Sequence, residues 1–262
     1  MMMGSNIQLK FQNGAQLQKR WGSPKPPELE RIFLYLIETG FQGPRSWKDP
    51  TTFSFDRPLD DDLFVRVAIG SVGEYPSGVF NFDTTIFFYS RYIEEIESSL
   101  DLWEREQSGV DQSLVEREPY AALFSITLSH LKWNAVPGGN PKWSIMAPNS
   151  SQQQIDSGWI ADWKAYGETY LGKIKNTKDL VDTLTNAESY KRSPWVKSDG
   201  MLGVSIMERT AILLTRLGRR DEAKKLLAGW QINIDRPSGQ FNLSRAAAFT
   251  KRRVQKILRW IG

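Results

Sequence analysis

The acidic and imidazole side chains are the first place to look for chemistry, and they offer few combinations. His130 is the single histidine of the 262-residue chain, so a Ser-His-Asp site would have to use it as the base. Its sequence neighbour Ser129 would point to the opposite face of a strand. We therefore favour a structural role for His130. With one histidine and no cysteine, the chain cannot supply a multi-histidine metal centre, thiolate catalysis, disulfides or cysteine-bound metals.

Two sets of carboxylates could support a hydrolase that uses Mg²⁺. Asp60, Asp61 and Asp62 are consecutive, and carboxylate oxygens suit Mg²⁺ or Ca²⁺, but neighbouring acids in a turn rarely converge on one ion. Asp83 lies among aromatic residues in a predicted strand, where burial would raise its pKa. A solvated turn and an outward Asp83 explain both patterns more simply. We predict no catalytic and no metal-binding residues, and keep the hydrolase as an alternative.

A phosphate-binding loop is the remaining common chemical motif, and its pattern is missing. The segment Gly70–Gly73 lacks the Lys-Ser/Thr ending and the following helix that a P-loop requires. The sequence therefore predicts no cofactor.

The positive charge of the chain is concentrated at its C-terminal end. The net charge is +4, yet residues 236–262 contain no acid and the following basic residues: Arg236, Arg245, Lys251, Arg252, Arg253, Lys256 and Arg259. The remainder is net negative, so a nucleic-acid surface spread over the whole chain is not supported. Ser244 is predicted to cap a helix over 245–261.

That helix has two interpretations. One side carries apolar residues (Ala247, Val254, Ile257, Leu258 and Ile261), and the rest carries Lys251, Arg252, Lys256 and Arg259. The cations could bind phosphates or an acidic partner. Alternatively, the helix packs by its apolar side and carries ordinary surface charges.

Aromatic residues are abundant, with ten tryptophans. Trp159, Trp163, Tyr166 and Tyr170 recur at helical spacing, which favours core packing. Tryptophan and arginine also dominate protein–protein hot spots. We therefore take Trp47 and Trp143 as candidate partner-binding residues, together with the four tail cations Lys251, Arg252, Lys256 and Arg259.

These observations predict a non-enzymatic binding protein, with enzymatic activity left open. It would occlude or dock another protein, as toxin-neutralising immunity proteins do. The alternatives are nucleic-acid association through residues 244–262 and the hydrolase named above. The chain has no cysteine, no apolar run of about 18 residues and no secretory apolar region, so we expect a cytoplasmic protein without a membrane span.

The elements that would position these residues indicate an α+β fold. Helical spacing predicts a helix over 28–39, and alternation predicts strands over 51–57, 63–69 and 78–89, joined as an antiparallel meander. Residues 41–50 are predicted as a loop. Ser90 should cap the next helix. Residues 120–133 fit either a helix or a strand, and we prefer a strand because large residues alternate with smaller ones up to Leu128. With residues 142–146 as the returning strand, they would form a second hairpin, giving about five strands.

Helices dominate the second half of the chain. Thr177 is predicted to cap a short helix, and residues 201–217 and 221–230 should form a helical pair around Gly218. We predict a sheet-containing part over 1–150 and a helical part over 151–262 packed on it as one continuous unit.

The order of these elements resembles bacterial domain of unknown function 4304 over roughly residues 28–184. The resemblance rests on Gly40-Phe41, Trp47, Phe53, Arg57, the strand 80–88, Leu128, His130-Leu131, Lys142-Trp143-Ser144-Ile145, Tyr166-Gly167, Tyr170-Leu171, Leu180 and Leu184. The segment 107–119 and the C-terminal third depart from the pattern. The resemblance implies an α+β fold in a bacterial cytosolic protein and brings no catalytic residues.

Overall fold

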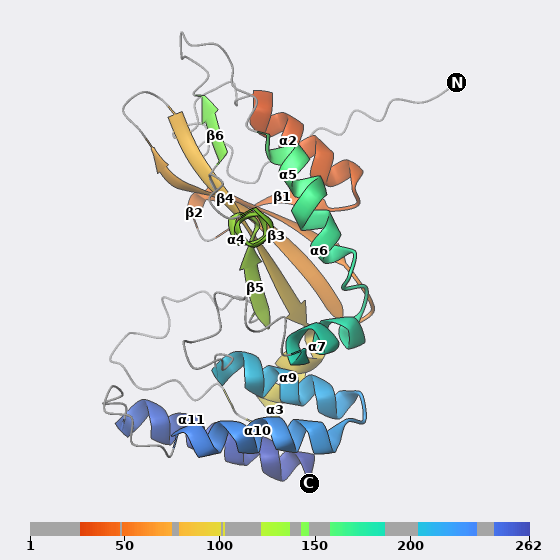
Figure 1. Ribbon diagram of the computed structural model, residues 1–262, viewed down its shortest axis with the longest axis vertical. Helices are drawn as coiled ribbons and strands as arrows, with labels where there is room; N and C mark the ends of the chain where they lie inside the picture. Colours follow the sequence, from red (N-terminus) through yellow and green to blue (C-terminus); the bar gives the residue numbers. More distant parts are fainter. Residues whose placement is uncertain are drawn as a thin grey trace. The chain divides into compact units, whose positions relative to one another are not determined.

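The computed structural model describes residues 27–47, 49–74, 79–100, 102, 122–136, 143–146, 158–186, 204–234 and 244–262. Strands occupy the N-terminal half and helices the C-terminal half, which confirms the α+β class (Figure 1).

One antiparallel sheet contains the six described strands. They are β1 (Gln42–Trp47), β2 (Asp49–Pro58), β3 (Leu63–Glu74), β4 (Val79–Ser90), β5 (Phe124–Thr127) and β6 (Trp143–Met146). The order is β1-β2-β3-β4-β5, so the predicted meander of β2, β3 and β4 is confirmed, and β6 pairs with β4. Along β4, Phe82, Thr84, Ile86 and Phe88 are buried, as the alternation predicted.

The prediction of a loop over residues 41–50 is wrong, because β1 forms there. Its register with β2 shifts between Gln42 and Arg45, and a bulge on an edge strand tolerates Pro44, which has no N–H to donate. Gly43 is required at this point, since a Cβ there would lie 2.8 Å from the carbonyl oxygen of Ser54.

The predicted second hairpin is also wrong. The strand β5 stops at Thr127, whose hydroxyl accepts a hydrogen bond from the N–H of His130 and caps helix α4 (Leu128–Ala135). The strand β6 pairs with β4 instead, with Phe82 opposite Trp143. Alternation alone favoured strand through residue 128, because it does not register a cap that allows the chain to turn into a helix.

The chain divides into two compact units that interleave along the sequence. The first comprises Met1–Arg57, Val65–Phe87 and Ile126–Tyr170, and the second comprises Pro58–Phe64, Phe88–Ser125 and Leu171–Gly262.

In the first unit, two helical segments cover the aromatic face of the sheet. Helix α2 (Pro27–Glu38) lies beside α5 (Trp159–Asp162) (Figure 1). The Phe33 ring of α2 lies 4.8 Å from Phe53 and 5.1 Å from Phe55 between centroids. The Trp159 indole N–H donates to the Thr84 hydroxyl at 2.8 Å. The predicted core role of this tryptophan is therefore confirmed.

The helix of the aromatic stripe changes type after Asp162. A π-helical turn, η2 (Trp163–Glu168), follows α5 and leads into α6 (Thr169–Leu171). Trp163 is fully buried and stacks on Trp159 with ring centroids 5.2 Å apart. Its indole covers Gly167 so closely that a Cβ there would lie 2.6 Å from Cε3. The absence of a side chain at Gly167 is therefore what admits the Trp163 ring.

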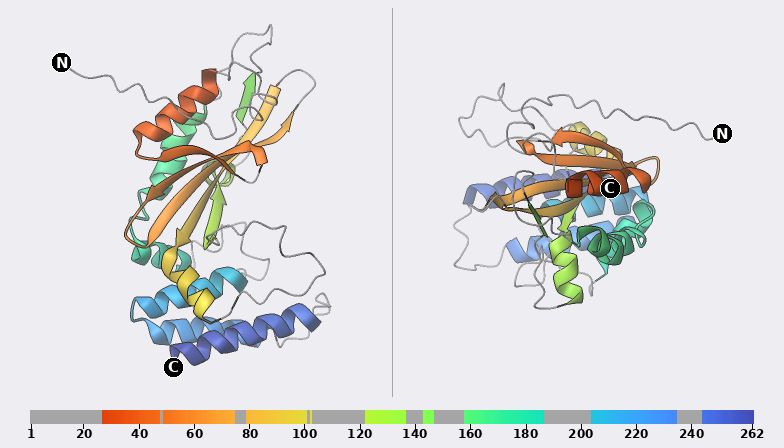
Figure 2. Two further views of the ribbon diagram at one scale, coloured as in Figure 1. Left: turned by 180° about the vertical axis from the view of Figure 1, so that it is seen from behind. Right: turned by 90° about the horizontal axis from the view of Figure 1, so that it is seen from above.

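The second unit contains a group of packed helices. They are α3 (Arg91–Ser99), α7 (Thr177–Thr185), α9 (Val204–Arg216), α10 (Arg220–Ile234) and α11 (Ser244–Ile261). Figure 2 shows α9, α10 and α11 packed together. Ser90 caps α3 by accepting from the N–H of Ile93, and Gly218 (φ 76°) separates α9 from α10, both as predicted.

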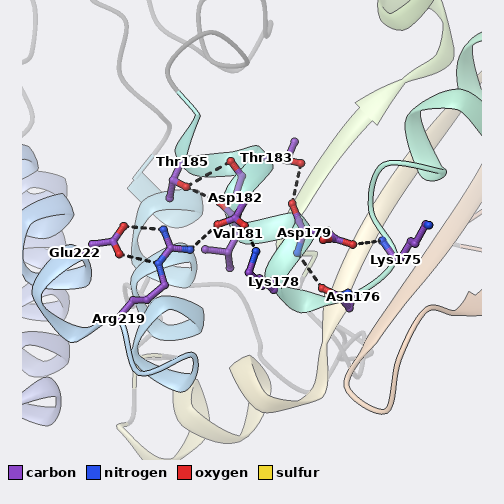
Figure 3. Close-up of polar contacts among 10 residues, drawn as sticks. All are labelled: Lys175, Asn176, Lys178, Asp179, Val181, Asp182, Thr183, Thr185, Arg219 and Glu222. Atoms are coloured by element: carbon purple, nitrogen blue, oxygen red, sulfur yellow. Dashed lines mark hydrogen bonds and ion pairs between the residues drawn. The ribbon is translucent and has the colours of Figure 1, made fainter.

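Helix α7 is capped by Asn176, whose side chain accepts from the N–H of Asp179, so the predicted cap at Thr177 is wrong by one residue. Ion pairs link α7 to the turn between α9 and α10 (Figure 3). Asp182 pairs with Arg219 at 2.5 Å and with Lys178 at 2.7 Å. Arg219 also pairs with Glu222 at 2.7 Å. Solvent-exposed pairs of this kind add little stability each.

Among the helices that the structure describes, none is both long enough and apolar enough to cross a bilayer.

Candidate partner-binding surface

Helix α11 is attached to its unit by an apolar face. Val254, Ile257 and Ile261 are at most 1 % exposed and follow the i, i+3, i+7 spacing of one helical face. The helix packs against α9 and α10. The apolar side predicted from the sequence is therefore occupied by the protein itself.

Arg253 fastens the same helix through buried charge. Its Nε and Nη2 atoms each lie 2.9 Å from Oε2 of Glu208 on α9, and Nη2 lies 3.8 Å from Oε1 of Glu97 on α3. Its Nη1 donates to the Leu102 carbonyl. Arg209 also pairs with Glu97, at 2.8 Å. Two carboxylates thus face two guanidinium groups, and this cation of the tail is used inside the protein.

The Glu208 carboxylate is the member of this cluster whose charge is least favourable in its buried position. Burial raises its pKa above the ordinary value and the nearby Glu97 adds to that rise, while the bond and the charge of Arg253 partly oppose it. Its Oε1 atom is buried without a hydrogen-bond partner in the described part of the chain. Charged Glu208 is therefore tolerated chiefly because Arg253 is present.

The remaining described cations of α11 face outward. Lys251, Arg252 and Arg259 are exposed and Lys256 is half-buried. At about 100° per residue, the four side chains fall within a sector of roughly 140°, over a rise of about 12 Å. No acid occurs from residue 244 to 262. The outer face of α11 is therefore a compact basic surface, which we call the basic face.

The two tryptophans predicted as partner-binding residues have different outcomes. Trp143 is 2 % exposed, its ring packs against Phe82, and its indole N–H donates to Asp162 at 2.8 Å. The prediction of Trp143 as a surface residue is corrected accordingly: pairing β6 with β4 turns the side chain inward. Trp47 ends β1, and its side chain lies outside the described residues.

The candidates for nucleophilic catalysis contact different neighbours. His130 lies on helix α4 rather than on a strand, with its Nε2 atom 2.8 Å from Nδ2 of Asn134. The Ser129 hydroxyl donates to Asp83 at 2.6 Å. Ser129 and Asp83 therefore contact each other directly, whereas Nε2 of the imidazole contacts an amide.

The acidic turn organises the start of two helices. Asp60 accepts hydrogen bonds from the N–H groups of Leu63 at 2.5 Å and Thr177 at 2.8 Å. Asp62 accepts from the Tyr92 N–H at 2.7 Å and pairs with Arg216 at 2.6 Å. Among the described residues, no three acidic or imidazole side chains are grouped to hold a metal ion.

Hydrogen bonding also sets the charge of Asp60. Burial acts to raise its pKa, but the bonds from the N–H groups of Leu63, Thr177 and Asp62 outweigh burial and hold the pKa below the ordinary value. An ionised Asp60 therefore stabilises the first turn of α7 from outside the helix.

Two tryptophans that we did not predict as candidates reach the surface. Trp133 on α4 is 49 % exposed, and Trp260 on α11 is half-buried. The spacing of Arg252, Lys256 and Trp260, four residues apart each, was a readable signal in the sequence. Trp133 was hidden by the wrong assignment of its segment to a strand.

Comparison with known proteins found no matching family model, no matching curated protein and no matching solved structure. The resemblance to domain of unknown function 4304 therefore stays a prediction.

Proposed function

We propose that this chain is a non-enzymatic cytoplasmic protein that binds an acidic partner protein on the basic face of α11, acting by occlusion as immunity proteins do. One observation carries the proposal: the apolar side and Arg253 attach α11 to its own unit, while Lys251, Arg252 and Arg259 are exposed. Arg252 and Arg259 are both exposed, so their charges face the solvent.

The size of the basic face favours a protein over a nucleic acid. Four cations over about 12 Å can neutralise at most about four phosphates, whereas nucleic-acid-binding proteins commonly contact about six to ten. The rest of the chain is net negative and would repel a polyanion that extended beyond the helix. A folded acidic partner can match the small surface alone.

The positions of the acidic residues also support a binding role. Two of the carboxylates considered for a hydrolase site receive hydrogen bonds at helix starts, Asp60 from α7 and Asp62 from α3. Their chemistry in this fold is to satisfy backbone N–H groups.

The test measures binding of acidic proteins encoded by neighbouring genes, with fluorescence anisotropy of the labelled partner as the readout. We expect a dissociation constant near micromolar, the range of ordinary transient interfaces. The variant Lys251→Glu/Arg252→Glu/Arg259→Glu should weaken it at least 100-fold. An equal change of charge at Lys164, Lys173 and Lys225, which are away from α11 in the sequence and not buried, should have little effect.

Two outcomes would overturn the proposal. Undiminished binding by the α11 triple variant would remove the basic face from recognition. If a duplex DNA of 20 base pairs bound more tightly than every acidic protein, with a log–log salt slope of about −3.6 for four phosphates, the nucleic-acid alternative would replace it.

A further inference from the structure

A row of three side chains runs along the edge of the basic face. Arg252, Lys256 and Trp260 are each four residues apart, and such neighbours lie one above another on a helix. Trp260 is half-buried and stands between fully buried Ile261 and exposed Arg259. A partly exposed tryptophan therefore lies at the C-terminal end of the basic face.

We propose that Trp260 is the apolar anchor of this surface, and that the partner presents an apolar side chain between carboxylates. The inference rests on the proposed function and specifies its partner. Arg252 and Lys256 lie about 6 Å apart along the helix axis, so the matching carboxylates are spaced by about one helical turn. The Trp260 ring packs on the apolar side chain that lies between them.

The charges alone are too weak to give a stable complex. An exposed ion pair changes a binding constant by about fivefold at most, so four pairs reach only about millimolar affinity. Micromolar binding needs about a thousandfold more. Burying the exposed part of a tryptophan can supply such a gain, because aromatic and arginine side chains at the centre of an interface carry most of its affinity.

Contacts on both sides of Trp260 hold the C-terminal end of α11 in place before a partner binds. The neighbours of Trp260 along the chain, Ile257 and Ile261, are fully buried, and Lys224 donates to the carbonyl of Gly262 two residues beyond the ring. The end of α11 is therefore held in place, which lowers the entropy lost when a partner binds.

The test uses two synthetic peptides of 15 residues. Both carry glutamate at every fourth position on an alanine background, and one has a single leucine between two glutamates. The full chain is labelled with 5-fluorotryptophan, and the Trp260 ¹⁹F signal is assigned with Trp260→Phe. We expect the leucine peptide to bind at least tenfold more tightly and to shift the Trp260 signal.

Two variants separate the anchor from the charges. Trp260→Ala should abolish the tenfold preference for the leucine peptide, whereas Trp133→Ala, which removes an exposed tryptophan of another helix, should retain it. The Trp260 signal in the unmutated chain reports the contact even if an alanine variant folds poorly.

The failures of the two proposals are distinguishable. Suppose that reversing the α11 charges abolishes binding of both peptides. If the unmutated chain then binds the two peptides equally, or if Trp260→Ala keeps the preference for the leucine peptide, the anchor is refuted and the role of the basic face is retained. If charge reversal leaves binding of both peptides intact, the proposed function itself falls.

Discussion

Arg253→Met should destabilise the second unit far more than the same change at the neighbouring Arg252. Arg253 is the described cation that bonds the buried Glu208 carboxylate, and removing one member of a buried pair leaves the other charge uncompensated. Glu208 can then respond by taking up a proton. Protonating a carboxyl of ordinary pKa about 4.3 costs about 3.7 kcal/mol at pH 7 and about 1 kcal/mol at pH 5, at 1.36 kcal/mol per pH unit.

The free energy of unfolding should therefore fall by about 3–4 kcal/mol at pH 7, with a smaller loss at pH 5. Linkage gives the direction of this pH dependence. In Arg253→Met, the pKa of Glu208 is higher in the folded than in the unfolded state, so protonation of Glu208 favours the folded state. This contribution to the free energy of unfolding is fully present below pH 4.3 and is lost as the pH rises through the folded-state pKa. Urea unfolding followed by circular dichroism at both pH values measures the difference.

Two further variants decide whether the buried pair is the cause. Arg252→Met, on the exposed side, should change the free energy of unfolding by less than about 0.5 kcal/mol. Arg253→Met/Glu208→Leu should recover most of the loss, because an apolar replacement of a buried ion pair is often neutral. A loss that is equal at pH 5 and pH 7, or that persists in the double variant, would refute the reasoning.

The remaining predictions concern Gly167 and Asp60. Gly167→Ala should lower the free energy of unfolding by about 1–3 kcal/mol, because the new Cβ overlaps the Trp163 ring. Gly229→Ala on α10, where nothing lies within 4 Å, should instead be neutral or stabilising by up to about 1 kcal/mol. Urea unfolding measures both variants, and changes of the same sign in the two would count against this packing. Asp60→Asn should destabilise by about 1–2 kcal/mol at pH 7 through weaker bonds to the α7 backbone. Because the pKa of Asp60 is lowered in the folded state, the unmutated chain loses this stability as the pH falls below about 3.9 and through the folded pKa. The stability–pH curves of the unmutated chain and Asp60→Asn should therefore converge at low pH. Curves that stay parallel, or an equal effect of Asp61→Asn at an exposed position, would exclude this role.

Much of the fold could be predicted wherever the physical cause is local. Period-two alternation in β4 and period-3.6 spacing in α2 each reflect one buried face of one element, and Ser90 reveals its cap because the bonded N–H is three residues away. The segment after Phe124 was assigned wrongly because its alternation up to Leu128 concealed a local cap at Thr127, which accepts from the N–H of His130. The pairing of β6 with β4 is a different case, because it is a contact between distant segments that alternation does not encode.

The basic face was predictable only in part. By itself the sequence determined that the last 27 residues are basic and free of acids, and that their helix has an apolar side. Only the tertiary structure decided that Arg253 turns in toward Glu208 while Arg252 turns out, and that Trp143 is buried while Trp260 is not. The physical reason is that a helix rotates by about 100° per residue, so which of two neighbouring cations meets solvent depends on where α9 and α3 place their carboxylates.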